Sequence, residues 1–329
     1  MTRTMAARPM IRGVSFVVAL GLLTGCAQGP LSTQSARIGP DDGSDACRQY
    51  VVALDSTGNY FGADILKGAA MGAVAGGLVG GLIGGNWKGA LIGAGAGAVL
   101  GGAAGYWGAL QQQASDQATL NTRVRGDLNQ ENVAIDKTQL AFNQLMDCRF
   151  RQAGAIQADY AARRIDRPTA ISYMSGLKQR AQRDLAIASQ INGQIASRGA
   201  QFDVAADNLA PGATARPRAA SRSATLRSAA PLKLRPDAGA PEIASLPAQQ
   251  QVTISPAKAG YVLVETPSGQ RGYAPADAIS GGASMRQAST SQSDDVRSLA
   301  GSNAARRDDF AQSVTVSERA VASGFELAS

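Results

Sequence analysis

The sequence predicts a protein of several parts, mainly α with one small all-β unit. The expected parts are a glycine-patterned helical hairpin, a long antiparallel helical hairpin or coiled coil, a small β-barrel, and a disordered linker and tail. Three observations predict this class: glycines at every fourth position between residues 62 and 108, a proline-free apolar stripe after residue 109, and short alternating runs between 231 and 280.

The composition argues against an enzyme. Only 5% of the 329 residues are aromatic, and there is no histidine. A Ser-His-Asp triad, a Cys-His pair and a histidine-ligated zinc site are therefore all excluded. No nucleophile with a matching base stands out elsewhere. We expect no catalytic residue, no metal site and no cofactor.

Residues 1–25 have the pattern of a bacterial signal peptide. Three arginines precede an apolar run over Val14–Leu23, which is too short to span a bilayer. The run leads into Leu23-Thr24-Gly25-Cys26, which resembles the lipobox of bacterial lipoproteins. The alternative is an ordinary cleaved signal followed by a chance cysteine.

The lipobox resemblance implies cleavage before Cys26, a diacylglycerol on its thiol and acylation of the new amino group. More than one acyl chain makes membrane attachment effectively permanent. The residue after the cysteine is Ala27 rather than Asp, which by the family rule implies transfer to the outer membrane of a Gram-negative envelope. Residues 26–61 would then form the lipidated N-terminal segment, facing the periplasm.

The block at 62–108 holds 17 of the 38 glycines, separated mainly by Ala, Val, Leu and Ile. Spacing by four places glycines along one helix face, where another helix can approach closely. The interruption at Asn86-Trp87-Lys88 divides the block into two segments near the minimum length for a membrane span. The predicted zipper residues are Gly68, Gly72, Gly76, Gly80, Gly84, Gly89, Gly93, Gly97, Gly101 and Gly105.

The block resembles the glycine-zipper two-helix segments of Gram-negative outer-membrane lipoproteins and surface antigens. We interpret it as a membrane-associated or self-associating helical hairpin, with Trp87 and Lys88 at its tip and Tyr106 and Trp107 as interfacial anchors at its far end. Membrane lipid and a second copy of the chain are the expected partners. A flexible glycine-rich linker is the alternative.

Residues 109–208 predict an antiparallel helical hairpin or coiled coil that acts as a spacer. Leu120, Val124 and Leu128 begin an apolar stripe, and Asp166-Arg167-Pro168 supplies a stop followed by a new helix start. Cys47 and Cys148 are the candidates for a disulfide in an oxidising periplasm. Cys148 lies farther from the glycine-patterned block than Cys47 does, so a straight helix after the block would carry Cys148 past Cys47. The pairing therefore requires either an extended stretch at residues 55–62 or a bend in the helix.

The segment at 209–230, rich in Ala, Pro, Arg and Ser, predicts a basic flexible linker. Its arginines are not interleaved with aromatics, so no nucleic-acid partner is expected. Short strand-like runs follow at 231–280. Their order, Leu232–Pro236, Ile243–Val252, Gly260–Val264 and Gly272–Ile279, resembles the bacterial SH3-like (SH3b) domain.

The SH3b resemblance implies a small barrel that binds peptidoglycan or an envelope protein. Tyr261 and Tyr273 stand at the family's tryptophan positions and would contribute to a shallow aromatic groove. Packing of both tyrosines inside the barrel is the alternative. The tail at 281–329 predicts disorder, apart from a short helix over Asp294–Ala305.

Taken together, the sequence predicts a non-enzymatic outer-membrane lipoprotein that tethers or spaces parts of the envelope. An oligomeric zipper component of a pore or export machine is the alternative.

Overall fold

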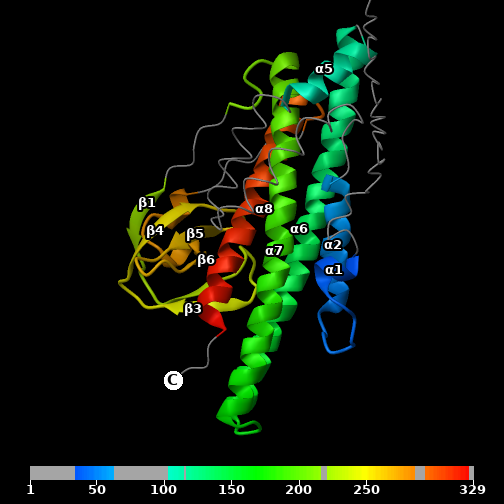
Figure 1. The fold of residues 1–329 in the computed structure, drawn as a ribbon. Coiled ribbons are helices and arrows are strands. Elements are labelled where there is room, and N and C mark those ends of the chain that lie inside the picture. Colours follow the sequence, from blue (N-terminus) through cyan, green and yellow to red (C-terminus); the bar gives the residue numbers. More distant parts are fainter. Residues whose placement is uncertain (1–33, 63–102, 115, 216–220, 286–292, 326–329) are drawn as a thin grey trace, which may run out of the picture.

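The computed structural model describes residues 34–62, 103–114, 116–215, 221–285 and 293–325. The lipidation candidate Cys26 and every predicted zipper glycine except Gly105 lie outside these residues. The described part is mostly helical, with one six-stranded antiparallel sheet packed against the helices (Figure 1).

Four helices form the bundle: α2 (Arg48–Gly62), α6 (Gln117–Ala161), α7 (Arg167–Leu209) and α8 (Val296–Gly324). The shorter α1 (Gln34–Ile38) and α5 (Ala103–Gln113) pack on its sides. α7 lies against both α6 and α8, and the far end of the α6–α7 pair projects beyond the other elements (Figure 1).

Local chemistry explains where the two long helices begin. The carboxylates of Asp116 and Asp166 accept hydrogen bonds from the backbone N–H groups of Thr119 and Thr169, which caps α6 and α7. Pro168 occupies the first turn of α7, where its missing N–H costs nothing. The two helices lie where the sequence predicts a hairpin, and α5 ends at Gln113, before α6 begins at Gln117.

The sheet consists of β1 (Arg222–Thr225), β2 (Ala230–Lys233), β3 (Glu242–Leu246), β4 (Gln251–Pro256), β5 (Tyr261–Glu265) and β6 (Arg271–Pro275). The strand order is β1-β4-β5-β6-β2-β3, with antiparallel pairing throughout. Val252, Ile254, Val262 and Val264 are buried in the sheet's own apolar core. Leu263 and Tyr273, paired across β5 and β6, belong instead to the core shared with the helices.

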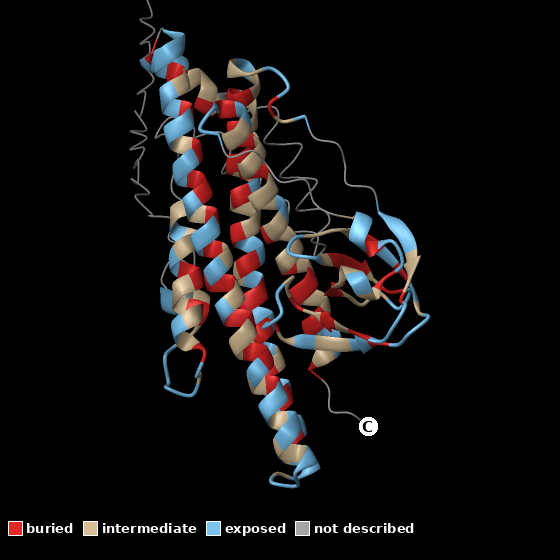
Figure 2. Ribbon diagram, turned by 180° about the vertical axis from the view of Figure 1, so that it is seen from behind, coloured by how far each residue is buried: buried red, intermediate tan, exposed pale blue. Residues whose placement is uncertain are grey.

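Two predictions of disorder are wrong. The tail contains the 29-residue helix α8, whose buried residues include Phe310, Val314 and Val321 and pack between the sheet and the bundle (Figure 2). The segment at 209–230 contains the edge strand β1, followed by the fully buried Leu226. Neither segment carries a strong local apolar pattern, which is why the sequence predicted disorder. Each is ordered by packing against residues that are distant in the sequence.

Candidate functional site

The structure places the predicted site residues in different environments. Tyr273 is 5% exposed and is covered by the bundle, which leaves it no access to an external ligand. Tyr261 is half-buried and lines a cleft at the edge of the sheet. Tyr106, expected at a membrane interface, is instead fully buried: its ring packs against Phe202, and its hydroxyl donates to Asp127.

The disulfide between Cys47 and Cys148 is formed and joins residues 101 positions apart. Of the two routes that the sequence offered, the extended stretch does not occur, because residues 48–62 form the helix α2. The pairing is possible because α2 runs antiparallel to α6, so that Tyr60 at its far end reaches Glu131. The break before α6 then lets α5 fold back along the bundle.

The segment outside the described residues, 63–102, is flanked by two neighbouring positions on α7. Gly62 lies beside Gln194, while Tyr106 packs on Phe202. These two α7 residues are separated by about 12 Å along the helix at 1.5 Å per residue. Gly62 and Tyr106 therefore contact α7 at positions about two helical turns apart.

Buried charges reinforce the disulfide. The guanidinium of Arg149, whose side chain is 1% exposed, donates to Asp184 on α7 at 2.7 Å and to Asp45, which precedes α2, at 2.6 and 2.8 Å. Burial raises the pKa of Asp184, and the bond from Arg149 offsets this only in part. Burial also acts on Asp45, but the bonds from Arg149 and from the Cys47 backbone N–H lower its pKa below the ordinary value.

A second buried pair lies further along the bundle. Arg198 of α7 donates to Glu131 of α6 at 2.6 Å, and its guanidinium stacks 4.8 Å from the centre of the Tyr60 ring. Burial and the adjacent Glu131 carboxylate raise the pKa of Tyr60 to about 12. Both buried cations thus tie α2, or the segment just before it, to the long hairpin.

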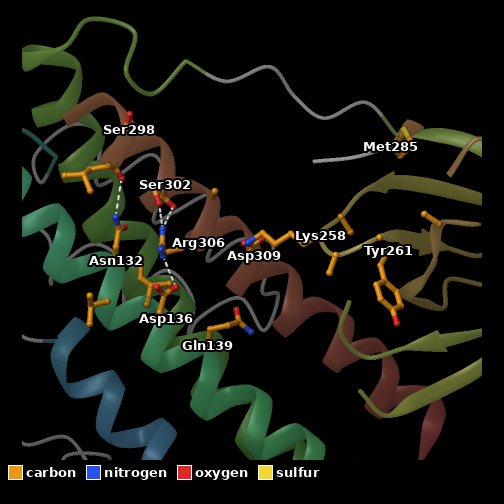
Figure 3. A pocket seen from close by; sticks show the side chains of 18 of the residues that line it. Asn132, Asp136, Gln139, Lys258, Tyr261, Met285, Ser298, Ser302, Arg306 and Asp309 are labelled. Atoms are coloured by element: carbon orange, nitrogen blue, oxygen red, sulfur yellow. Dashed lines mark hydrogen bonds and ion pairs between the residues drawn. The ribbon is translucent and has the colours of Figure 1, made fainter. Parts of the chain in front are cut away.

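A polar cleft of about 1180 Å³ lies between one end of the sheet and the helices α6 and α8, beside their shared apolar core (Figure 3). One wall is formed by α6 and α8, and the other by the β4–β5 turn, the end of β6 and the short helix η1 (Ala276–Ala278). Both walls are mixed: the helical wall carries amides, hydroxyls and four charged residues, and the sheet wall carries the ring of Tyr261 with Lys258 and Asp277. The polar lining residues include Asn129, Asn132, Gln139, Ser298, Ser302, Lys258, Tyr261 and Asp277.

Most charges in the cleft are paired. Arg306 of α8 donates to Asp136 of α6 at 2.8 Å, and Lys258 of the β4–β5 turn contacts Asp309 of α8 (Figure 3). Asn132 completes the helical wall: its Oδ1 accepts from the buried Asn303, and its Nδ2 donates to a backbone carbonyl of α8. The wall is therefore held in place by hydrogen bonds between α6 and α8.

The β4–β5 turn holds Lys258 and Tyr261 beside the cleft through an uncommon backbone. Ala259 and Gly260 have φ angles of 55° and 78°, in the left-handed region that a non-glycine residue such as Ala259 seldom adopts. The turn is closed by a hydrogen bond from the Tyr261 N–H to the Lys258 carbonyl, and the Gly260 carbonyl accepts from the Ala276 N–H. Backbone strain of this kind is concentrated at active sites and ligand-binding loops, where the surrounding structure holds the loop in place.

No protein-family model, curated protein or solved structure matches the chain. Among the described residues, no helix combines the length and apolar character needed to cross a membrane, and no cluster of metal-binding side chains occurs. The cleft is the concave surface toward which polar groups of the sheet and of the helices converge, so we take it as the candidate site.

The sequence predicted Tyr261 as a ligand-binding candidate but missed the cleft beside it. Its walls come from residues 129–139, 257–261, 275–285 and 293–309, which no local motif connects. The usable signal was the placement of Asn132 and Gln139 four residues after Leu128 and Ile135, beside the apolar stripe of α6.

Proposed function

We propose that the chain is a non-enzymatic lipoprotein of the cell envelope, anchored by acyl chains on Cys26 and binding peptidoglycan at its sheet-bearing end. In this proposal the glycine-patterned block associates with the outer membrane from the periplasmic side. The long hairpin acts as a spacer, and the small sheet is an SH3-like module that works together with the helices packed on it.

The Cys47–Cys148 disulfide is the observation that supports an exported protein most strongly. Structural disulfides persist in oxidising compartments such as the periplasm and are rare where thiols are kept reduced. This bond also ties the segment that follows the lipidation candidate to the middle of the hairpin. An anchor at Cys26 would thus be connected covalently at two points to the part that bears the cleft.

Ion pairs between sheet and bundle support a role as a spacer that presents one surface. Arg235, just after β2, donates to Asp147 of α6 at 2.6 Å, and Arg319 of α8 donates to Glu265 of β5 at 2.9 Å. α6 would be about 68 Å long at 1.5 Å per residue. A sheet fixed on such a helix holds its binding surface at a set distance from the membrane.

Metabolic labelling tests the anchor. Cells expressing the chain are fed a labelled fatty acid, and the Cys26→Ser variant is compared with the wild type. We expect label and outer-membrane fractionation for the wild type and neither for the variant. A wild-type chain that takes up no label would refute lipidation.

Retention on purified peptidoglycan sacculi tests the second half of the proposal. The full mature chain is used, because the sheet packs on the helices and its separate folding has not been shown. We expect the chain to sediment with sacculi and to be released when they are digested with a muramidase. A chain that remains in the supernatant at every sacculus concentration would refute peptidoglycan binding.

A further inference from the structure

The end of the long hairpin that contains the α6–α7 turn is strongly basic. Residues 151–183 carry seven Arg and Lys and two Asp, a net charge of +5. The remaining described residues of the bundle and its connections carry eleven Arg and Lys against seventeen Asp and Glu, a net charge of −6. These remaining residues are 34–62, 103–114, 116–150, 184–209 and 293–325. The bundle is therefore electrically polarised, with its positive charge gathered toward the end that projects beyond the other elements (Figure 1).

Two arginines at the turn are available to a partner. Arg163 lies in the turn and Arg167 begins α7; both are exposed, and neither forms an ion pair with any residue that the structure describes. The nearby carboxylates are already engaged, because Asp159 pairs with Arg164 and Asp166 caps α7. The positive charge of the turn is therefore not neutralised locally.

The backbone of the turn holds one of these cations at a conformational cost. Arg163 has a φ angle of 56°, in the left-handed region. Its N–H donates to the Tyr160 carbonyl, and the following Arg164 N–H donates to the Asp159 carbonyl, which closes the end of α6. Glycine is the usual residue at this position of a helix end. The chain has a long charged side chain there instead.

Exposed apolar side chains lie close to the same turn. Ile171 and Tyr173, in the first two turns of α7, are 51% and 57% exposed. Positions two apart on an α-helix point about 200° away from each other, so the two side chains lie on different sides of α7. A rigid protein face covers one side of a hairpin, whereas mobile lipid headgroups gather around several sides. Tyrosine beside cationic side chains is typical of the membrane–water interface.

We propose that this end of the α6–α7 hairpin docks on a bilayer surface rich in anionic phospholipid, with Arg163 and Arg167 at the phosphate groups and Ile171 and Tyr173 in the interfacial layer. Charge complementarity carries the inference, since basic clusters are attracted to anionic bilayers. It goes beyond the proposed function and does not depend on it, because neither acylation nor cell-wall binding enters the argument.

The contact is also separate from the glycine-patterned block. Arg167 lies about 40 Å along α7 from Gln194, beside which Gly62 begins that block. A readout close to the turn therefore reports the docking of this end and not the behaviour of the block.

A fluorescent label at the turn tests the proposal. The full chain from residue 26 carries Cys26→Ser and Ser172→Cys, so that the new thiol is the only free one, since Cys47 and Cys148 are disulfide-bonded. The label is mixed with vesicles of phosphatidylcholine, with or without phosphatidylglycerol, that contain a nitroxide-bearing lipid as quencher. We expect quenching on the anionic vesicles and little on the neutral ones. Equal quenching on both, or none on either, would overturn the proposal.

A second label position distinguishes docking of the turn from adsorption of the whole chain. Ser228→Cys places the same label at an exposed serine between β1 and β2, in place of Ser172→Cys. We expect the anionic vesicles to quench this label much less than the label at 172. Equal quenching at the two positions would contradict docking through the hairpin end.

Paired substitutions assign the contact to the turn. Arg163→Gln with Arg167→Gln should lower the ratio of docked to free label about 25-fold, because each cation close to an anionic surface contributes about a factor of five. Lys137→Gln with Arg227→Gln is the matched control: it removes the same charge from two exposed positions elsewhere and should behave as the wild type. Equal losses in the two double variants would overturn the assignment.

A charge-preserving variant separates a lipid surface from a protein partner. Arg163→Lys with Arg167→Lys should retain docking, because a fluid layer of headgroups responds to charge rather than to the planar fork of a guanidinium group. Loss of docking in the lysine variant would refute bilayer docking and would indicate a carboxylate-bearing protein as the occupant.

Discussion

The bundle makes two interfaces of opposite character. On one side, α2 and the residues before it are held by a disulfide and by the buried cations Arg149 and Arg198. On the other side, the sheet is held by an apolar contact that includes Leu263 and Tyr273 and by ion pairs, of which Lys258–Asp309 and Arg319–Glu265 are substantially exposed.

The two interfaces are expected to differ in how much their charged groups contribute to the free energy of unfolding. A charge buried with its partners is strongly destabilising if one partner is removed, whereas an exposed ion pair contributes little. The first interface is therefore suited to a permanent connection with the N-terminal segment, where we propose the lipid anchor. The second leaves an open polar cleft along its edge, and most of the charges that line this cleft are paired with one another.

The largest expected effect is from Arg149→Met. The variant leaves Asp184 buried without its cation, which should lower the free energy of unfolding by about 3–5 kcal/mol. Urea denaturation of the disulfide-intact protein measures the loss. Arg235→Met is the matched control: its ion pair with Asp147 has side chains 20% and 16% exposed, against 1% and 5% for Arg149–Asp184, so the loss should be smaller. Equal losses in the two variants would contradict the distinction between the interfaces.

Removal of the disulfide should have the next largest effect. Cys47→Ser with Cys148→Ser frees a loop of about 100 residues in the unfolded chain, and bonds of this kind typically contribute about 2–4 kcal/mol. We expect the double variant to unfold at a lower urea concentration while retaining its helical signal. A midpoint identical to that of the oxidised wild type would show that the bond does not stabilise the fold.

A smaller effect is expected at the sheet interface. Arg319→Ala removes a pair whose two side chains are 39% and 41% exposed, so the loss should be no more than about 1 kcal/mol and should shrink as salt is added. Denaturation at low and at high ionic strength measures both. A loss of several kcal/mol at high salt would place the sheet contact in the same class as the disulfide side.

The smallest expected effect is the loss of stability at acid pH when Asp295, the N-cap of α8, becomes protonated. Hydrogen bonds from Ser293 and from the Ser298 backbone N–H lower the pKa of Asp295 to about 2. Because the folded pKa is lowered, the cap stabilises the protein above the ordinary aspartate pKa, and this stabilisation is lost as the pH falls toward 2.

Melting temperatures of the wild type and Asp295→Ala, measured from pH 7 downward, test this cap. Their difference should be largest near neutral pH and should shrink below pH 4. The neighbouring Asp294→Ala is the control, because Asp294 does not cap the helix through its side chain. A difference independent of pH would mean that the carboxylate charge at Asp295 does not contribute.

The sequence predicted those parts of the fold that local chemistry determines. Asp166 and Pro168 mark the start of α7, and the stripe through Leu120, Val124 and Leu128 marks the buried face of α6; all three of these leucine and valine residues are buried. The sequence also identified Cys47 and Cys148 as the pair, although the route by which they meet is different.

The missed elements depend on distant partners. The buried face of α8 includes small or polar residues such as Ala300, Ala304 and Ser317 beside Phe310. This face is too weakly apolar to predict a helix from the sequence, and it is buried only because α6 and α7 pack against it. The four-residue strand β1 exists because β4 pairs with it. The cleft could not be predicted for the same reason, since its two walls meet only after the sheet has packed on the bundle.

The central claim is that the cleft contacts the cell wall in the living envelope. A photo-crosslinking amino acid in place of Tyr261 tests it most directly, with the same group in place of Tyr173, which is 57% exposed near the far end of the hairpin, as control. After irradiation of intact cells, we expect the chain labelled at 261 to remain with the sacculi in boiling detergent until muramidase releases it, and the chain labelled at 173 to dissociate. Release of both chains before digestion would contradict the proposed contact.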